Sequence, residues 1–234
     1  MSEVTDKIRS KGYWDAVIRP GNFDEERVNY EALEDTLESI VVSLRGWPVP
    51  YVDRRTAFLR GDDWIGQDID AKRVSHYEAW RFFTSGQFNQ IRAVSADWRT
   101  GSDWQTGSET RVPHGFTSVI EVWEILFYLT EVFEFATRLS LSPAGDEAMT
   151  VSVRLDGLGG RALVVDQPKR IPFDHPYGPP PPSLAFEATL SRQELAAKPR
   201  EAAVEMARDF FLRFGWKPSR EQLAEWQREL TGNR

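Results

Sequence analysis

The chain has 234 residues with no cysteine, nine tryptophans and a formal net charge of −7. The lack of cysteine excludes disulfide frameworks, thiolate zinc sites, iron–sulfur clusters and cysteine nucleophiles, and it fits a reducing compartment. A chain of this length can bury a core without cross-links, and its acidic balance disfavours long-range attraction to a phosphate backbone unless basic residues gather on one face.

The N-terminal stretch is polar and lacks the apolar segment of a secretory signal, so we expect a cytoplasmic protein. The longest apolar stretch, residues 118–141, contains four glutamates, and carboxylates at membrane depth are costly. We therefore expect no association with a membrane.

The first predicted elements are a strand over residues 13–18 and a helix that follows Asp24. Pro20 and Gly21 end the strand. Asp24 can cap the helix, whose apolar residues recur with a helical period as far as Leu44, and Gly46 is placed to end it.

Residues 47–98 have the pattern of several strands, and Ser85-Gly86 predicts a hairpin turn between residues 75–83 and 87–94. Both faces of the first hairpin strand carry aromatic side chains, which predicts that it lies between two packed layers. A short helix over residues 76–83 is the competing interpretation. The polar residues 97–113 predict a connecting loop.

A helix over residues 118–141 opens the second part of the chain. At 100° per residue its glutamates share one sector, which favours a solvated stripe on an otherwise buried helix. These residues are Glu121, Glu124, Glu131 and Glu134.

Strands at residues 150–155 and 161–166 are predicted to form a tight hairpin through Gly157–Gly160. Proline-rich residues 168–182 must be extended, and residues 183–190 predict another strand. Ser191, Pro199 and Ser219 then begin three helices, by a capping box, a first-turn proline and a further cap.

Together these patterns predict an α+β protein of two packed halves, residues 1–112 and 113–234. Each half would place a long helix against a mainly antiparallel sheet, with further helices at the C-terminus.

Motif searching excludes several common enzyme classes, because the sequence has no phosphate-binding loop, nucleophile elbow, zinc-protease helix or EF-hand loop. The acidic run from Asp62 to Asp70 leaves a metal-dependent hydrolase as an alternative, although its spacing fits no ligand template. An acidic turn is the favoured interpretation. We expect no catalytic residues, no metal and no cofactor.

Aromatic residues form the first candidate site, because nine tryptophans exceed the roughly three that average usage gives. Such side chains anchor cores and interfaces alike. A core role is favoured for those of the hairpin, with an interface as the alternative. The candidates for interaction are Trp47, Trp64, Trp80, Phe82 and Phe88.

Arginine-rich hairpins form the second candidate site, for single-stranded nucleic acid, if folding places them beside exposed rings. Charged residues that protect sheet edges are the simpler explanation. The candidates are Arg54, Arg55, Arg60, Arg161, Lys169 and Arg170, with Arg154 nearby.

The stretches YWDAVIRP, RGWPVPY, EAWRFFTSGQF and FFLRFGW resemble an accessory region of bacterial proteins that carry a Schlafen-type AlbA_2 module for binding nucleic acid or ATP. The resemblance spans residues 13–216, and RGWPVPY and EAWRFFTSGQF are its distinctive parts. The module itself is not recognisable in this chain, and Val49 and Tyr51 replace an aspartate and a histidine of the pattern. The resemblance implies an accessory or sensing role.

The sequence therefore favours a non-enzymatic binding or regulatory module that works with a separate nucleic-acid- or nucleotide-handling partner. We expect a protein partner, with nucleic acid and a second copy of the chain as alternatives. Direct binding of single-stranded nucleic acid is the second hypothesis for function.

Overall fold

The structure is a computed structural model that describes residues 2–99, 112–165 and 172–229. Its strands are β1 (Tyr13–Pro20), β2 (Leu59–Arg60), β3 (Trp64–Ala71), β4 (His76–Phe83), β5 (Phe88–Ala93), β6 (Ser118–Glu121), β7 (Ala148–Asp156), β8 (Arg161–Val164) and β9 (Ser183–Ser191). Its helices are α1 (Glu3–Arg9), α2 (Leu33–Ile40), α3 (Val122–Leu141), α4 (Arg192–Ala197), α5 (Pro199–Phe214) and α6 (Arg220–Arg228), with 3-10 turns η1 (Tyr30–Ala32), η2 (Lys72–Val74) and η3 (Ser95–Asp97).

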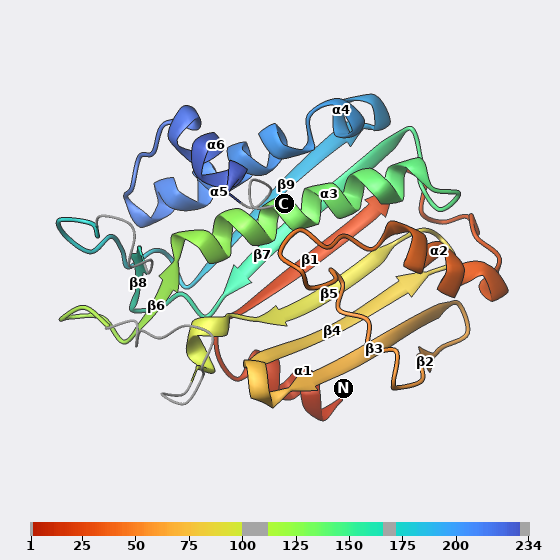
Figure 1. Cartoon of the computed structure of the whole chain (residues 1–234), viewed down its shortest axis with the longest axis horizontal. Helices are drawn as coiled ribbons and strands as arrows, with labels where there is room; N and C mark the ends of the chain where they lie inside the picture. The colour runs from red at the N-terminus through yellow and green to blue at the C-terminus, as the bar shows by residue number, and fades with distance from the viewer. Residues whose placement is uncertain (1, 100–111, 166–171, 230–234) are drawn as a thin grey trace.

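A seven-stranded sheet in the order β2-β3-β4-β5-β1-β7-β9 forms the centre of the fold (Figure 1). All its strand pairs are antiparallel, which confirms the α+β class with a mainly antiparallel sheet. β1 pairs with β5 on one side and with β7 on the other. Strands from residues 1–112 and from residues 113–234 therefore belong to one sheet.

Helix α3 lies across one face of this sheet, with α5 packed beside it (Figure 1). Alternate residues of β1, including Trp14, point towards α3 and are buried. The ring centroids of Trp14 and Tyr128 lie 4.8 Å apart, and those of Phe88 and Phe135 lie 4.5 Å apart. These contacts fix α3 on the sheet, since aromatic pairs add to the free energy gained by burying their area.

Helix α1 covers part of the opposite face, where Ile8 packs against Tyr77, Ala79 and Ala93. The hairpin of β4 and β5 turns at Gly86, which has a φ of +80°. The prediction that the first hairpin strand lies between two layers is confirmed over Tyr77 and Ala79. The competing interpretation, a helix at residues 76–83, is wrong.

The predicted helix to Leu44 is shorter than expected. α2 ends at Ile40, and the next residues turn back in an antiparallel bridge between Val42 and Val49. Gly46 has the expected positive φ of +85°, but it lies in this turn and does not end a helix. The β-branched run at Ile40, Val41 and Val42 suits an extended backbone, which explains the early end.

The predicted hairpin through Gly157–Gly160 is also wrong, because β8 pairs in parallel with β6 and not with β7. Gly157 and Gly160 have positive φ angles of +74° and +70°, which suit a tight turn of the chain. Lys169, Arg170 and most of the predicted loop at 97–113 lie outside the described residues.

The C-terminal helix signals are confirmed. Ser191 and Glu194 form the capping box of α4, Pro199 occupies the first turn of α5, and Gly215 ends α5 with a φ of +91°. The Ser219 side chain accepts a hydrogen bond from the backbone of Gln222 at the start of α6.

Candidate functional site

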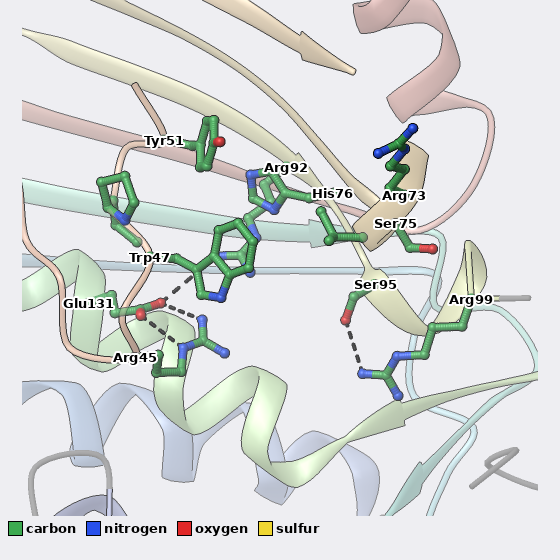
Figure 2. A pocket seen from close by; sticks show the side chains of 13 residues that line it. Arg45, Trp47, Tyr51, Arg73, Ser75, His76, Arg92, Ser95, Arg99 and Glu131 are labelled. Atoms are coloured by element: carbon green, nitrogen blue, oxygen red, sulfur yellow. Dashed lines mark hydrogen bonds and ion pairs between the residues drawn. The ribbon is translucent and has the colours of Figure 1, made fainter. Parts of the chain in front are cut away.

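A cavity of about 270 Å³ opens where α3, β4 and β5 meet the segment 45–51 (Figure 2). Four arginines line it, together with one histidine and an exposed tryptophan. We call this cavity the arginine pocket and define it by Arg45, Arg73, Arg92, Arg99, His76 and Trp47.

The arginines reach the pocket from four separate segments. Arg45 belongs to the turn that the Val42–Val49 bridge closes, Arg73 to η2, Arg92 to β5, and Arg99 follows η3. None of these segments contains a recognisable binding motif. The pocket therefore exists only because the sheet brings the segments together.

A left-handed residue, Ser75, directs two of the lining side chains. Its φ of +52° is uncommon for a residue with a Cβ atom. Ser75 stands between η2 and β4, so this conformation turns the chain from Arg73 to His76. The Ser75 hydroxyl donates a hydrogen bond of 2.8 Å to the carbonyl of Trp98, which holds this conformation.

A buried polar network lies beneath the pocket around Glu78. Its carboxylate lies 2.7 Å from His76 Nε2 and accepts hydrogen bonds from Gln90 Nε2 at 2.7 Å and from the Tyr51 backbone at 3.1 Å. Gln90 in turn accepts a hydrogen bond from the Tyr128 hydroxyl at 2.8 Å. The network fixes His76 at the pocket wall, because satisfied buried networks are rigid.

Burial raises the pKa of Glu78, but the contact with His76 and the charge of Arg92 outweigh it and hold that pKa below 4.5. A carboxyl group whose pKa is depressed by folding stabilises the protein above its unfolded pKa. That stability is lost as the pH falls through the folded pKa.

We therefore expect Glu78→Gln to flatten the fall in the free energy of unfolding as the pH drops below the ordinary pKa of a glutamate, about 4.3. The lost slope corresponds to about 1.4 kcal/mol for each pH unit between the unfolded and folded pKa values. Urea unfolding at a series of pH values measures it. Glu25→Gln, in an exposed turn, should leave the slope as it is. Equal slopes in the Glu78 variant and the parent would contradict the assignment.

The four glutamates of residues 118–141, which are Glu121 at the end of β6 and three in α3, are mostly buried, so the predicted solvated stripe is wrong. Glu121, Glu124 and Glu131 are 2%, 7% and 1% exposed, and Glu134 is partly exposed. Glu124 accepts hydrogen bonds from the backbone and hydroxyl of Ser95 at 2.9 and 2.8 Å. These glutamates face polar partners from other segments. Helical periodicity marks a polar face of a helix but does not show whether that face meets solvent or protein.

Two arginines of the pocket are held by these glutamates. Arg45 binds Glu131 through two hydrogen bonds of 2.9 and 2.5 Å, and Arg99 pairs with Glu121 through both nitrogens of its fork. Such two-point pairing fixes the guanidinium plane. Glu131 is the single acidic residue among those that line the pocket.

The other two arginines have donors to spare. Arg92 lies 3.9 Å from Glu131 and 5.3 Å from the centre of the Tyr128 ring, with 13% of its side chain exposed. Within the described ranges, the side chains of Arg92 and Arg73 donate no hydrogen bond. A guanidinium has five N–H donors, so both can bind an acceptor that enters the pocket.

Comparisons with family models, curated proteins and solved structures found no match. The resemblance to the Schlafen-type accessory region therefore stays a prediction from the quoted residues. It is notable for the site that Arg45, Trp47 and Tyr51 all lie within RGWPVPY.

The predicted interaction residues separate into two groups. Trp80, Phe82 and Phe88 are 1%, 0% and 2% exposed, so they are core side chains and offer no contact surface. Trp64 lies on the opposite face of the sheet, where Arg81 stacks on its ring at 4.8 Å. Trp47 alone among these five belongs to the arginine pocket, and it is 44% exposed.

The predicted nucleic-acid residues that the structure describes, Arg54, Arg55, Arg60 and Arg161, do not converge on one surface. Arg161 is buried against Asp97, so it is not part of an exposed hairpin. Each of the three arginines from 54 to 60 is exposed and lies beside a carboxylate. The pairs are Arg54 with Glu38, Arg55 with Asp53 and Arg60 with Glu34.

The acidic run is divided between two ion pairs. Asp68 pairs with Arg81 at 2.8 Å and Asp70 with Lys7 at 3.0 Å, while Asp62 and Asp63 lie in an exposed turn. In the described part of the chain, no three metal-ligating side chains form a cluster. No helix in that part combines the length and apolarity needed to cross a bilayer.

Sequence reasoning predicted none of the four pocket arginines as site residues, because they are separated along the chain and share no spacing. One signal was available. Carboxylates inside a helix as apolar as α3 require buried cationic or hydrogen-bonding partners, so Glu121 and Glu131 implied converging arginines from elsewhere.

Proposed function

We propose that this protein is a binding module that holds an anionic group of a ligand in the arginine pocket. The observation that carries this proposal is Arg92, whose side chain lines the cavity, meets Glu131 only at 3.9 Å and donates no hydrogen bond among the described residues. A guanidinium carries several N–H donors, and those of Arg92 reach the cavity. An anion in the cavity would accept from them through charge-assisted hydrogen bonds.

The charges around the cavity support the same conclusion. Four arginines face one carboxylate, Glu131, which Arg45 already engages through both of its oxygens. Glu121 and Glu124 stand behind the wall and bind Arg99 and Ser95. Arg92 also lies near the buried carboxylate of Glu78, whose pKa it helps to lower, but neither Arg92 nor Arg73 has a two-point carboxylate partner. Their guanidinium groups are the ones that a phosphate or carboxylate group would meet.

Binding also fits the wider role expected from the sequence. A module that senses a phosphorylated group can regulate a separate nucleic-acid- or nucleotide-handling partner, and the pocket is the place where that signal would enter. An activity of the module itself is not needed for this role.

We expect Arg92→Gln to weaken the binding of pyrophosphate by about 10- to 150-fold, because a hydrogen bond to a charged group contributes about 1.5–3 kcal/mol. Arg73→Gln should have a smaller effect in the same direction, since Arg73 is exposed and its charge is screened. Isothermal titration calorimetry with inorganic phosphate and pyrophosphate measures both.

Arg220→Gln is the matched control, because it removes one arginine charge from α6 and does not line the pocket. It should leave pyrophosphate affinity unchanged. The proposal fails if the parent protein binds neither anion, or if all three variants weaken binding equally, which would indicate a response to net charge alone.

A further inference from the structure

We infer that the arginine pocket takes a nucleoside phosphate, either a free mononucleotide or the 5′-phosphorylated end of a nucleic-acid strand. This inference rests on the proposed function and names its ligand. Such a ligand carries a ring as well as an anionic group, and the side chains that would hold the ring come from one side of the pocket.

Aromatic rings line that side. Trp47 is 44% exposed although indole is strongly apolar, and its ring centroid lies 6.1 Å from that of Tyr51. The Tyr51 ring also lies beside the His76 ring, and their centroids are 5.6 Å apart. The three rings form a connected wall at which a planar group can stack.

Two of the cationic groups, Arg73 and Arg99, come from the opposite side. Figure 2 shows Trp47, Tyr51 and Arg45 entering from one end of the pocket and Arg73, Ser95 and Arg99 from the other, with His76 and Arg92 drawn between them. A ligand that satisfies both ends carries a ring and an anion that are separated from one another.

The size and division of the pocket select among ring-bearing anions. A cavity of about 270 Å³ lies just below the range of ligand pockets, about 300–1,000 Å³, so its volume favours one small ligand, such as a single nucleotide unit, over a larger one. In a nucleotide the sugar separates the base from the phosphate, which matches the separated ends of the pocket. In phosphotyrosine the phosphate is bonded directly to the ring, so one of the two ends would remain unused.

Trp47 can be removed without disturbing the core, because it is exposed. We expect Trp47→Ala to weaken the binding of adenosine monophosphate by about 5- to 150-fold, the range for one base stacked on an aromatic side chain. The same substitution should leave inorganic phosphate affinity unchanged. Trp47→Phe should restore part of the nucleotide affinity, since it keeps a stacking face.

Calorimetry on the full chain with five probes tests the inference: inorganic phosphate, adenosine monophosphate, phosphotyrosine, and a short single-stranded oligonucleotide with or without a 5′-phosphate. We expect the nucleotide to bind more tightly than phosphate, and Trp64→Ala, on the far face of the sheet, to behave like the parent. Tighter binding of the phosphorylated strand than of the mononucleotide assigns the strand end as the source. The reverse order assigns the free nucleotide.

The results separate the two proposals. If phosphate binds but the nucleotide binds no more tightly, or if Trp47→Ala weakens both equally, the nucleoside assignment is overturned while the anion pocket stands. Preference for phosphotyrosine overturns it as well. If no probe binds, both proposals fail.

Discussion

Replacing Arg161 with methionine should lower the free energy of unfolding by about 3–5 kcal/mol, the usual cost of removing one partner from a buried ion pair. Arg161 is 2% exposed and donates to both oxygens of Asp97, at 2.8 and 2.7 Å. It also donates to the carbonyls of Val119 and Gly157. The substitution leaves a carboxylate and two carbonyls without these partners.

Equilibrium urea unfolding measures this loss. Arg154→Met is the matched control, because Arg154 belongs to the neighbouring β7 and pairs with Asp15 and Asp156 but has 48% of its side chain exposed. Exposed pairs contribute at most about 1 kcal/mol. Similar losses in the two variants would contradict a structural role that is specific to Arg161.

Replacing Glu131 with glutamine should lower the free energy of unfolding by about 3 kcal/mol and, in the opposite direction, tighten the binding of pyrophosphate. The stability effect lies at the low end of the buried-pair range because Arg45 is one-third exposed. The affinity should rise about fivefold, because Glu131 lines the pocket and its removal takes away a repulsion of about 1 kcal/mol, the value for two unit charges about 4 Å apart in water.

Glu134→Gln provides the control on the same helix. Glu134 pairs with Arg200, whose side chain is 46% exposed, and it does not line the pocket. It should change stability by less than about 1 kcal/mol and leave binding unaltered. Urea unfolding and calorimetry on the same samples give both quantities. A Glu131 variant that binds more weakly would show that Glu131 serves the ligand directly.

Much of the fold could be predicted from local signals. β1, the β4–β5 hairpin and β9 follow apolar or alternating patterns bounded by turn residues, and the caps at Ser191 and Ser219 lie where the structure has them. Each of these features depends on interactions between residues that are close together in the sequence. Those interactions are sufficient to specify them.

Partner choice was not predictable in the same way. The strands at residues 150–155 and 161–166 were identified, but β7 joins β1 and β9 while β8 joins β6. A glycine turn permits a hairpin without requiring one. Competition among strands from the whole chain decides which edges pair.

The candidate site shows the same limit more strongly. Trp47 was identified as a candidate, whereas none of the four pocket arginines was, and the glutamates of residues 118–141 were expected in water. The sequence does not distinguish a charged residue that meets solvent from one that meets a partner in a distant segment. Its environment is set by packing.

The sequence by itself determined the fold class, most element positions, the exclusion of cysteine chemistry and the core character of the hairpin aromatics, because these depend on composition and on short-range periodicity. The tertiary structure alone decided that Arg45, Arg73, Arg92 and Arg99 surround one cavity. The reason is that the desolvation and pairing of charges depend on distances of a few ångströms between residues far apart in the chain, and only the packed sheet and α3 define those distances.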